Sequence, residues 1–93
     1  MSGSAKVDVF VDNERVRVQR FTLPPGGDTG WHVHGTDYVI VPYSDGRLRV
    51  DTKTGPIEVT MKKDEPYFRQ KGVEHNVISL EPEPFAFLEI EIK

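Results

Sequence analysis

Hydrophobic and polar residues alternate along most of this chain of 93 residues, and short turn-forming stretches interrupt the alternation repeatedly. The stretch RVRVQRFTL, residues 15–23, alternates almost without a break, and YVIVP, residues 38–42, is apolar throughout. Side chains two residues apart share one face of a β-strand, so this period indicates half-buried strands. Turns such as PPGGDTG and SDG recur roughly every eight to twelve residues, as in a β-sandwich or small barrel. The pattern predicts an all-β fold of about eight or nine short strands, without helices.

The length of the chain predicts a single domain, residues 1–93. Residues 1–5, MSGSA, are predicted to be flexible or a remnant of cloning. A domain this small buries only about two-thirds of the surface that its unfolded chain exposes. A subunit partner or a bound metal would therefore add to its stability.

The chain contains no cysteine, which excludes disulfides, thiolate metal sites and a cysteine nucleophile. This composition fits a cytoplasmic location, and the first residues lack the apolar core of a signal peptide. The formal net charge is −3 and the twelve Lys and Arg residues are scattered, which argues against nucleic acid and anionic membranes as partners. No apolar run approaches the roughly 20 residues of a membrane helix. A small-molecule ligand is the expected partner.

The three histidines are the residues that most clearly suggest chemistry. His32 and His34 are two residues apart in a strand-like stretch, so their side chains would project side by side. His75 begins another such stretch, HNVISL, which a closed barrel could bring across to the pair. Three imidazoles suit divalent iron, zinc, nickel, copper or cobalt better than magnesium or calcium. Spacing alone supports two interpretations: one metal ion held by these histidines, or histidines with only structural roles.

The residues around the first two histidines resemble the first motif of the cupin superfamily, whose members are jelly-roll β-barrels. That motif is a glycine, five residues, His-x-His, three or four residues, a glutamate, and a glycine after six more. Gly26, His32 and His34 match it, and Gly46 comes one residue late. Tyr38 stands where the glutamate would be. The resemblance implies a cupin-type jelly roll (double-stranded β-helix) of short antiparallel strands, with a mononuclear site for one divalent transition metal.

The second cupin motif is matched less completely. It consists of a glycine, five residues, Pro-x-Gly, two residues, a histidine, three residues and an asparagine. Gly72 and His75 match, whereas Asp64, Gln70 and Ser79 stand where the first glycine, the proline and the asparagine would be. The resemblance therefore implies that His75 completes a three-histidine metal site.

Several residues are candidates to assist this site. The possible further ligands, or neighbours that hydrogen-bond to the ligands, are Asp37, Tyr38, Gln70 and Ser79. A phenol must lose its proton to become a strong ligand, so we expect Tyr38 beside the ion or in the cavity wall. Asp37 would reach the ion only through a local bulge. Tyr67 and Arg69 are candidates for substrate binding, because an arginine offers a carboxylate two parallel hydrogen bonds, although Arg69 would also fit a surface position.

The terminal stretch FAFLEIEIK, residues 85–93, alternates apolar and polar residues over its whole length. An exposed strand of this kind favours pairing with another chain. Together with VDVFV, residues 7–11, it predicts a homodimer built through β-strands. Cupins are commonly dimeric, which agrees with this expectation.

Within the superfamily, the stretches TGWHVHGTDYVIVP and YFRQKGVEHNV are similar to those of small cupins associated with β-alanine degradation. The resemblance implies metal-dependent chemistry, dioxygenase-like or another metal-assisted reaction, on a small polar or carboxylated metabolite, in β-alanine or related catabolism. Two alternatives stay open. The chain could be a binding module for a metal or small molecule without turnover, or a structural protein with a vestigial pocket.

Overall fold

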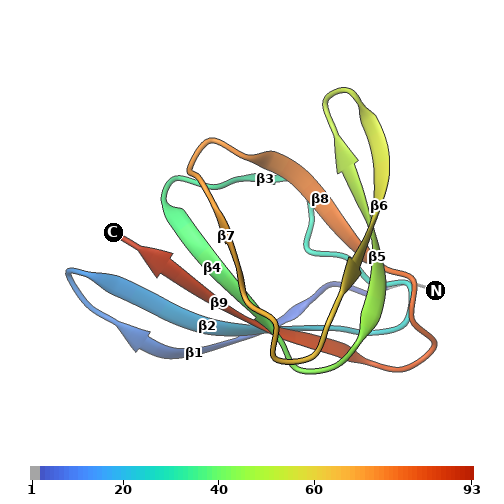
Figure 1. Ribbon diagram of the computed structural model, residues 1–93, viewed down its shortest axis with the longest axis horizontal. Coiled ribbons are helices and arrows are strands. Elements are labelled where there is room, and N and C mark those ends of the chain that lie inside the picture. Colours follow the sequence, from blue (N-terminus) through green and yellow to red (C-terminus); the bar gives the residue numbers. More distant parts are fainter. Residues whose placement is uncertain (1–2) are drawn as a thin grey trace.

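The computed structural model describes residues 3–93, and over this range it consists of β-strands without any helix (Figure 1). The nine strands are β1 (Lys6–Asp12), β2 (Val16–Leu23), β3 (His32–Val33), β4 (Asp37–Pro42), β5 (Gly46–Thr52), β6 (Gly55–Met61), β7 (Tyr67–Arg69), β8 (Glu74–Ser79) and β9 (Phe85–Ile92). The predicted all-β fold of short strands is thereby confirmed. No helix in the described range could cross a membrane.

The strands form two antiparallel sheets that curve around a shared interior (Figure 1). One sheet has the order β1-β2-β9-β4-β7 and the other has the order β3-β8-β5-β6. Strands that are far apart in the sequence therefore lie side by side, as in a jelly roll. The inward-facing core consists of Leu23, Tyr38, Ile40, Leu48, Met61, Val77, Phe85 and Phe87.

Strand β9 lies in the middle of the five-stranded sheet, between β2 and β4 (Figure 1). The expectation that residues 85–93 form an exposed strand available to another chain is therefore wrong. Its physical reason is the connection from β8, which crosses from one sheet to the other and inserts the last strand between two earlier ones. Phe85, Phe87 and Glu89 point inward from β9, whereas Ile92 is 44 % exposed on the outer side.

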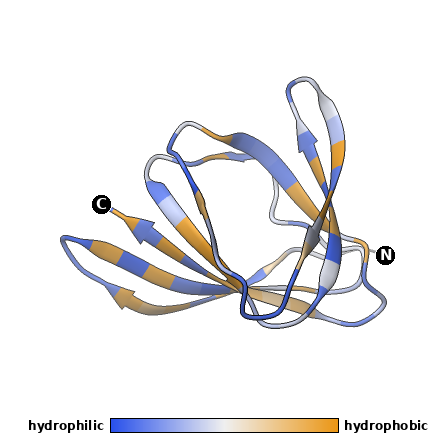
Figure 2. Ribbon diagram, viewed as in Figure 1, coloured by the Kyte–Doolittle hydropathy of each residue, from blue (hydrophilic) through white to orange (hydrophobic). Residues whose placement is uncertain are grey.

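The middle strands β4 and β9 of the five-stranded sheet are rich in apolar residues (Figure 2), and these occur on the outer as well as the inner side. Gln19 and Glu89 face inward, so residues at odd spacings from them in the strand register face outward. The apolar residues on the outer side are Val18, Val39, Val41, Phe68, Leu88, Ile90 and Ile92. An antiparallel sheet that faces water usually carries polar residues there. On this face Phe68 is 52 % exposed and Ile92 is 44 % exposed.

Gly46, at the start of β5, lies directly against the ring of Phe85. A Cβ atom at position 46 would be 2.5 Å from Cε1 and 2.6 Å from Cδ1 of that ring. Phe85 is only 1 % exposed and belongs to the packed core. The close contact between the two sheets at this point therefore requires a glycine.

The start of the described chain is tied to the rest of the fold. Ser4 forms a parallel bridge with Asp28, and the backbone N–H of Ala5 donates to the carbonyl of Asp28 at 2.8 Å. The predicted flexibility of Met1 and Ser2 concerns positions outside the described residues.

Candidate metal centre

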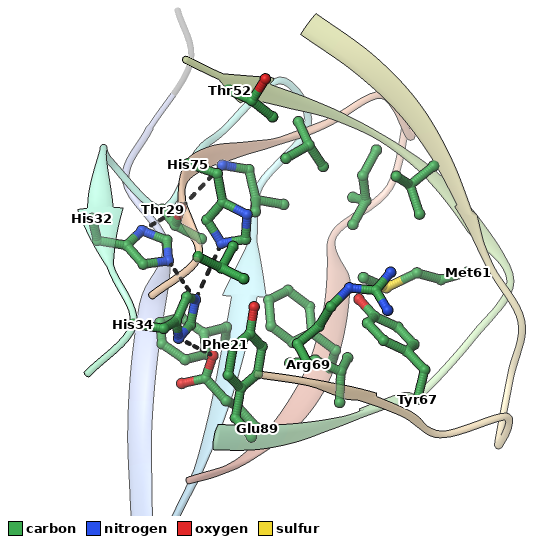
Figure 3. Close-up of a pocket in the computed structure, with 18 of the residues that line it drawn as sticks. Phe21, Thr29, His32, His34, Thr52, Met61, Tyr67, Arg69, His75 and Glu89 are labelled. Atoms are coloured by element: carbon green, nitrogen blue, oxygen red, sulfur yellow. Dashed lines mark hydrogen bonds and ion pairs between the residues drawn. The ribbon is translucent and has the colours of Figure 1, made fainter. Parts of the chain in front are cut away.

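The three histidines meet at one end of the barrel interior (Figure 3). His32 on β3 is the direct cross-strand partner of His75 on β8, and His34 follows two residues after His32. The Nε2 atom of His34 lies 3.0 Å from Nε2 of His32 and 3.1 Å from Nε2 of His75. The ring nitrogens of all three histidines thus lie close together, as the cupin resemblance implied.

Backbone contacts hold the segment after β3 so that His34 points inward. The N–H of His34 donates to the carbonyl of Val73 at 2.8 Å, and the N–H of Gly72 donates to the carbonyl of His34 at 2.7 Å. Gly72 has a φ of 95°, a conformation that favours glycine. The glycine of the second motif therefore has a local role, because it lets the chain turn so that residues 72 and 73 hydrogen-bond to the backbone of His34.

The tautomer of His32 leaves its inner nitrogen free to accept. Its Nδ1 lies 2.8 Å from the carbonyl of Gly30, so Nδ1 carries the proton and donates it. The lone pair of Nε2 then faces the other two rings. Among the described residues, the predicted acceptors Asp37, Gln70 and Ser79 accept no hydrogen bond from a histidine ring. For His32 the backbone carbonyl of Gly30 is the acceptor instead.

The spacing of the nitrogens fits a metal ion. Two nitrogens that each lie about 2.1 Å from one ion, at right angles to each other, are about 3.0 Å apart. The two Nε2 separations at His34 have this length. The donor set of three imidazoles, without thiolate or carboxylate, suits a divalent transition metal.

Burial keeps two of the histidines uncharged at neutral pH. It lowers the pKa of His34 to about 4 and that of His75 to about 4, and the neighbouring His32 adds to both shifts. A histidine must be neutral to offer its lone pair to a metal. The site is therefore ready to accept a cation without first releasing protons from these two rings.

A buried carboxylate, Glu89, lies behind His34 and was missed by the sequence analysis. Its Oε1 is 3.8 Å from Nδ1 of His34, and its Oε2 accepts a hydrogen bond of 2.7 Å from Nε2 of Gln19. The carbonyl oxygen of the Gln19 side chain accepts from Nε of Arg17 at 3.0 Å. Burial raises the pKa of Glu89 to about 7, and the hydrogen bond from Gln19 opposes the shift. Glu89 faces the same way as Phe87 on β9, but the alternation alone does not tell which face of this strand is inside.

Tyr38 lies flat against His34, with ring centroids 3.8 Å apart and planes at 16°. Burial raises the pKa of Tyr38 to about 12, so its phenol stays protonated. A protonated phenol is a weak ligand. The structure thus places Tyr38 in the cavity wall, against one of the three histidines.

The other candidate neighbours lie away from the histidines. Asp37 accepts a hydrogen bond from the backbone N–H of Lys71 at 2.9 Å, and Gln70 is exposed. Ser79 is buried, but it lies four residues beyond His75 on β8 and accepts from the backbone N–H of Glu81. The structure does not bring these three residues to the site.

A cavity of about 180 Å³ opens beside the histidines and extends between the two sheets (Figure 3). Tyr67 and Arg69, the candidates for substrate binding, both line it. The guanidinium carbon of Arg69 lies 4.6 Å from the centre of the Tyr67 ring. The cavity therefore joins a potential ion site to a cationic group, within a largely apolar enclosure.

Comparisons with known proteins agree with this architecture. Residues 19–91 match the family model described as a cupin domain. The chain is 44% identical, over the full length of both proteins, to the "Beta-alanine degradation protein BauB" of Pseudomonas aeruginosa. A cupin domain of Bordetella pertussis superposes with a TM-score of 0.97 at 45% identity, covering 100% of this chain and 97% of that one. A double-stranded β-helix protein of Klebsiella pneumoniae has a TM-score of 0.79 at 21% identity, covering 96% and 76%. The chain therefore belongs to the cupin domain family.

Proposed function

We propose that this cupin binds one divalent transition-metal ion through His32, His34 and His75 and acts on a small polar or carboxylated metabolite. The convergence of three Nε2 atoms beside a cavity carries this proposal. An ion bound there would supply a Lewis acid or a redox centre. Iron, zinc, nickel, copper and cobalt all suit the three imidazoles. The full-length similarity to BauB supports a place in β-alanine or related catabolism.

The residues of the chain have separate roles in this proposal. The three histidines hold the ion and leave other positions around it open, as catalytic sites require. The largely apolar walls contact the carbon atoms of a ligand, and Arg69, which is exposed, offers charge-assisted hydrogen bonds to a carboxylate. Tyr67 supports the guanidinium by stacking.

Metal analysis of protein purified without a histidine tag tests the proposal. We expect about one equivalent of a divalent transition metal, or its uptake on titration. His75→Ala should abolish this uptake. The matched control is Gln70→Ala, at an exposed position that does not contact the histidines, and it should bind metal normally. No uptake by the parent protein, or unchanged uptake by His75→Ala, would contradict the three-histidine site.

A binding module without turnover is the second candidate function. It is favoured by Tyr38, whose protonated phenol stands where the cupin motif has a metal-binding glutamate. Metal-loaded protein that binds a ligand saturably, but forms no product over long incubation, would support this candidate over the enzyme.

We also propose that the protein forms a homodimer through the outer face of the five-stranded sheet. The part of this face on β4, β7 and β9 is apolar, and Phe68 and Ile92 on it are exposed. Five strands about 4.8 Å apart and up to eight residues long present a face of roughly 500 Å². This flat area approaches the roughly 800 Å² of accessible surface that a stable complex buries on each partner.

The state of assembly can be measured by light scattering coupled to size exclusion. Ile90→Glu would place a charge at the centre of the outer face and should yield monomers with an unchanged circular dichroism spectrum. Val33→Glu, at a 59 % exposed position on the other sheet, is the matched control and should stay dimeric. A parent protein that is monomeric at micromolar concentration would contradict the proposal. The cytoplasmic location stays a prediction, which fractionation of cells can test.

A further inference from the structure

The cavity beside the histidines is lined by a few polar side chains and a larger number of apolar ones. The polar groups come from the three histidines, Thr29, Tyr38, Thr52, Tyr67, Arg69 and Glu89. The aliphatic and aromatic walls come mainly from Leu48, Val50, Ile57, Val59, Met61 and Phe87. A ligand that fills this space must therefore present carbon to most of the walls and polarity at one end.

Arg69 is the only permanently cationic side chain among the described residues that line the cavity. Its one protein acceptor is the carbonyl of Phe68, at 3.2 Å from Nη1, and it forms no ion pair within residues 3–93. A guanidinium has five N–H donors, so most of them remain available. In Figure 3 the Arg69 group lies over Tyr67, between the histidines and Met61. A carboxylate within the cavity would find its natural partner here.

An ammonium group would find no equivalent partner. The one carboxylate in the described lining is Glu89, which is 4 % exposed and already engaged by Gln19 at 2.7 Å and by the neighbouring His34. An ammonium placed against the apolar walls would lose its hydration without compensation, which is costly. The cavity therefore disfavours a zwitterion.

The volume of the cavity limits the size of the ligand. A cavity of about 150 Å³ with apolar walls holds benzene, a molecule of six carbon atoms. The 180 Å³ available here thus corresponds to a molecule of about six or seven heavy atoms. A short carboxylic acid with an unbranched or once-branched carbon chain has this size.

We propose that the cavity binds a short aliphatic monocarboxylate without an ammonium group, with its carboxylate at Arg69 and its carbon chain against the apolar walls. This ligand class deepens the proposed function and rests on it for the reaction at the histidines. The binding preference itself depends only on Arg69 and the walls. It implies that the ligand is not β-alanine, although a relative is named for the degradation of that compound.

Three ligands of equal size test the proposal by NMR chemical-shift titration of the full chain, both metal-free and loaded with zinc. Butanoate has a methyl group where β-alanine has an ammonium group, and butanamide replaces the carboxylate of butanoate with an uncharged amide. We expect butanoate to bind at least about tenfold more tightly than β-alanine, because the ammonium must be buried unpaired. We expect butanamide to bind about tenfold more weakly than butanoate, because the charge-assisted hydrogen bonds are lost.

Two variants distinguish a direct contact between Arg69 and the ligand from a general effect of the charge of the protein. Arg69→Gln should weaken butanoate binding about tenfold and leave butanamide binding nearly unchanged. Arg49→Gln is the matched control, because Arg49 pairs with Asp51 at an exposed site outside the cavity and should leave both affinities unchanged.

The outcomes distinguish this inference from the proposed metal function. Binding of β-alanine as tight as butanoate, equal binding of butanamide and butanoate, or no butanoate binding at tens of millimolar would overturn the ligand class. If the chain takes up no metal, the proposed function fails. The ligand class is then still tested by whether the metal-free protein binds butanoate more tightly than β-alanine and butanamide. If metal binds but β-alanine is preferred, the metal function stands and the ligand class is wrong.

Discussion

Replacing Glu89 with Gln would test how the chain prepares His34 to bind a metal ion. Oε2 of Glu89 accepts a hydrogen bond from Nε2 of Gln19, and its Oε1 faces Nδ1 of His34 at 3.8 Å. Gln19 cannot turn its side-chain amide around, because its carbonyl oxygen is held by Arg17 at 3.0 Å. The oxygen of a glutamine at position 89 must therefore face Gln19, and its NH₂ group must face His34.

An NH₂ group beside Nδ1 of His34 disfavours the tautomer that a metal needs. With a donor opposite Nδ1, the ring gains a hydrogen bond by moving its proton to Nε2, which removes the lone pair from the site. Loss of such a partner typically reduces metal affinity about 10- to 100-fold, which corresponds to about 1.4 to 2.7 kcal/mol. The upper part of this range is expected here, because both side chains are buried and water screens them little.

The zinc dissociation constant, measured by competition with a chromogenic chelator above pH 7, reports the effect. Glu91→Gln is the matched control, because Glu91 accepts from the same Nε2 of Gln19 at 3.2 Å but does not contact a histidine. Its affinity for zinc should stay within about twofold of the parent protein. Equal zinc affinities for the two variants would refute the role of Glu89, and NMR of the imidazole nitrogens would show whether the tautomer of His34 had changed.

Two further properties can be predicted from the structure. Gly46→Ala would press a Cβ atom to 2.5 Å from the ring of Phe85 and should lower the free energy of unfolding by about 1–3 kcal/mol in urea titrations. Gly35→Ala, where nothing lies within 4 Å, should change it by less than about 0.5 kcal/mol, and similar losses for both variants would refute the packing argument. Burial raises the pKa of Tyr38 and of Tyr67 to about 12, so the folded chain keeps two phenol protons that the unfolded chain releases near pH 10. The free energy of unfolding should therefore fall as the pH rises from 10 to 12, and an ultraviolet titration in which all three tyrosines ionise together near pH 10 in the folded protein would contradict this.

The strand pattern and the side-by-side placement of His32 and His34 could be predicted because both follow from local rules. A period of two fixes which residues share a face, and it placed His32 and His34 on the same side. The cupin resemblance supplied the long-range part, namely that β8 brings His75 opposite His32. Hydrogen bonding between distant strands is not encoded in local composition, and the family pattern was needed to find it.

The same alternation does not say which face is inside, and this is why Glu89 was missed. In FAFLEIEIK the glutamates alternate with isoleucines, and composition favours isoleucine in the core. The structure has the opposite arrangement at this end of β9, with Glu89 at 4 % exposure and Ile92 at 44 %. The glutamate can face inward because Gln19 and His34 lie beside it, and both of these residues come from other parts of the chain.

The hydrogen-bonded row behind His34 reaches the surface of the protein. Arg17, which holds Gln19, also pairs with Asp12 at 3.2 Å near the turn between β1 and β2. Substitutions at that turn can change how firmly Glu89 is held, and thereby the basicity of His34, without changing the shape of the cavity. Related chains can thus diverge in metal preference during evolution while they keep the same three histidines and the same ligand space.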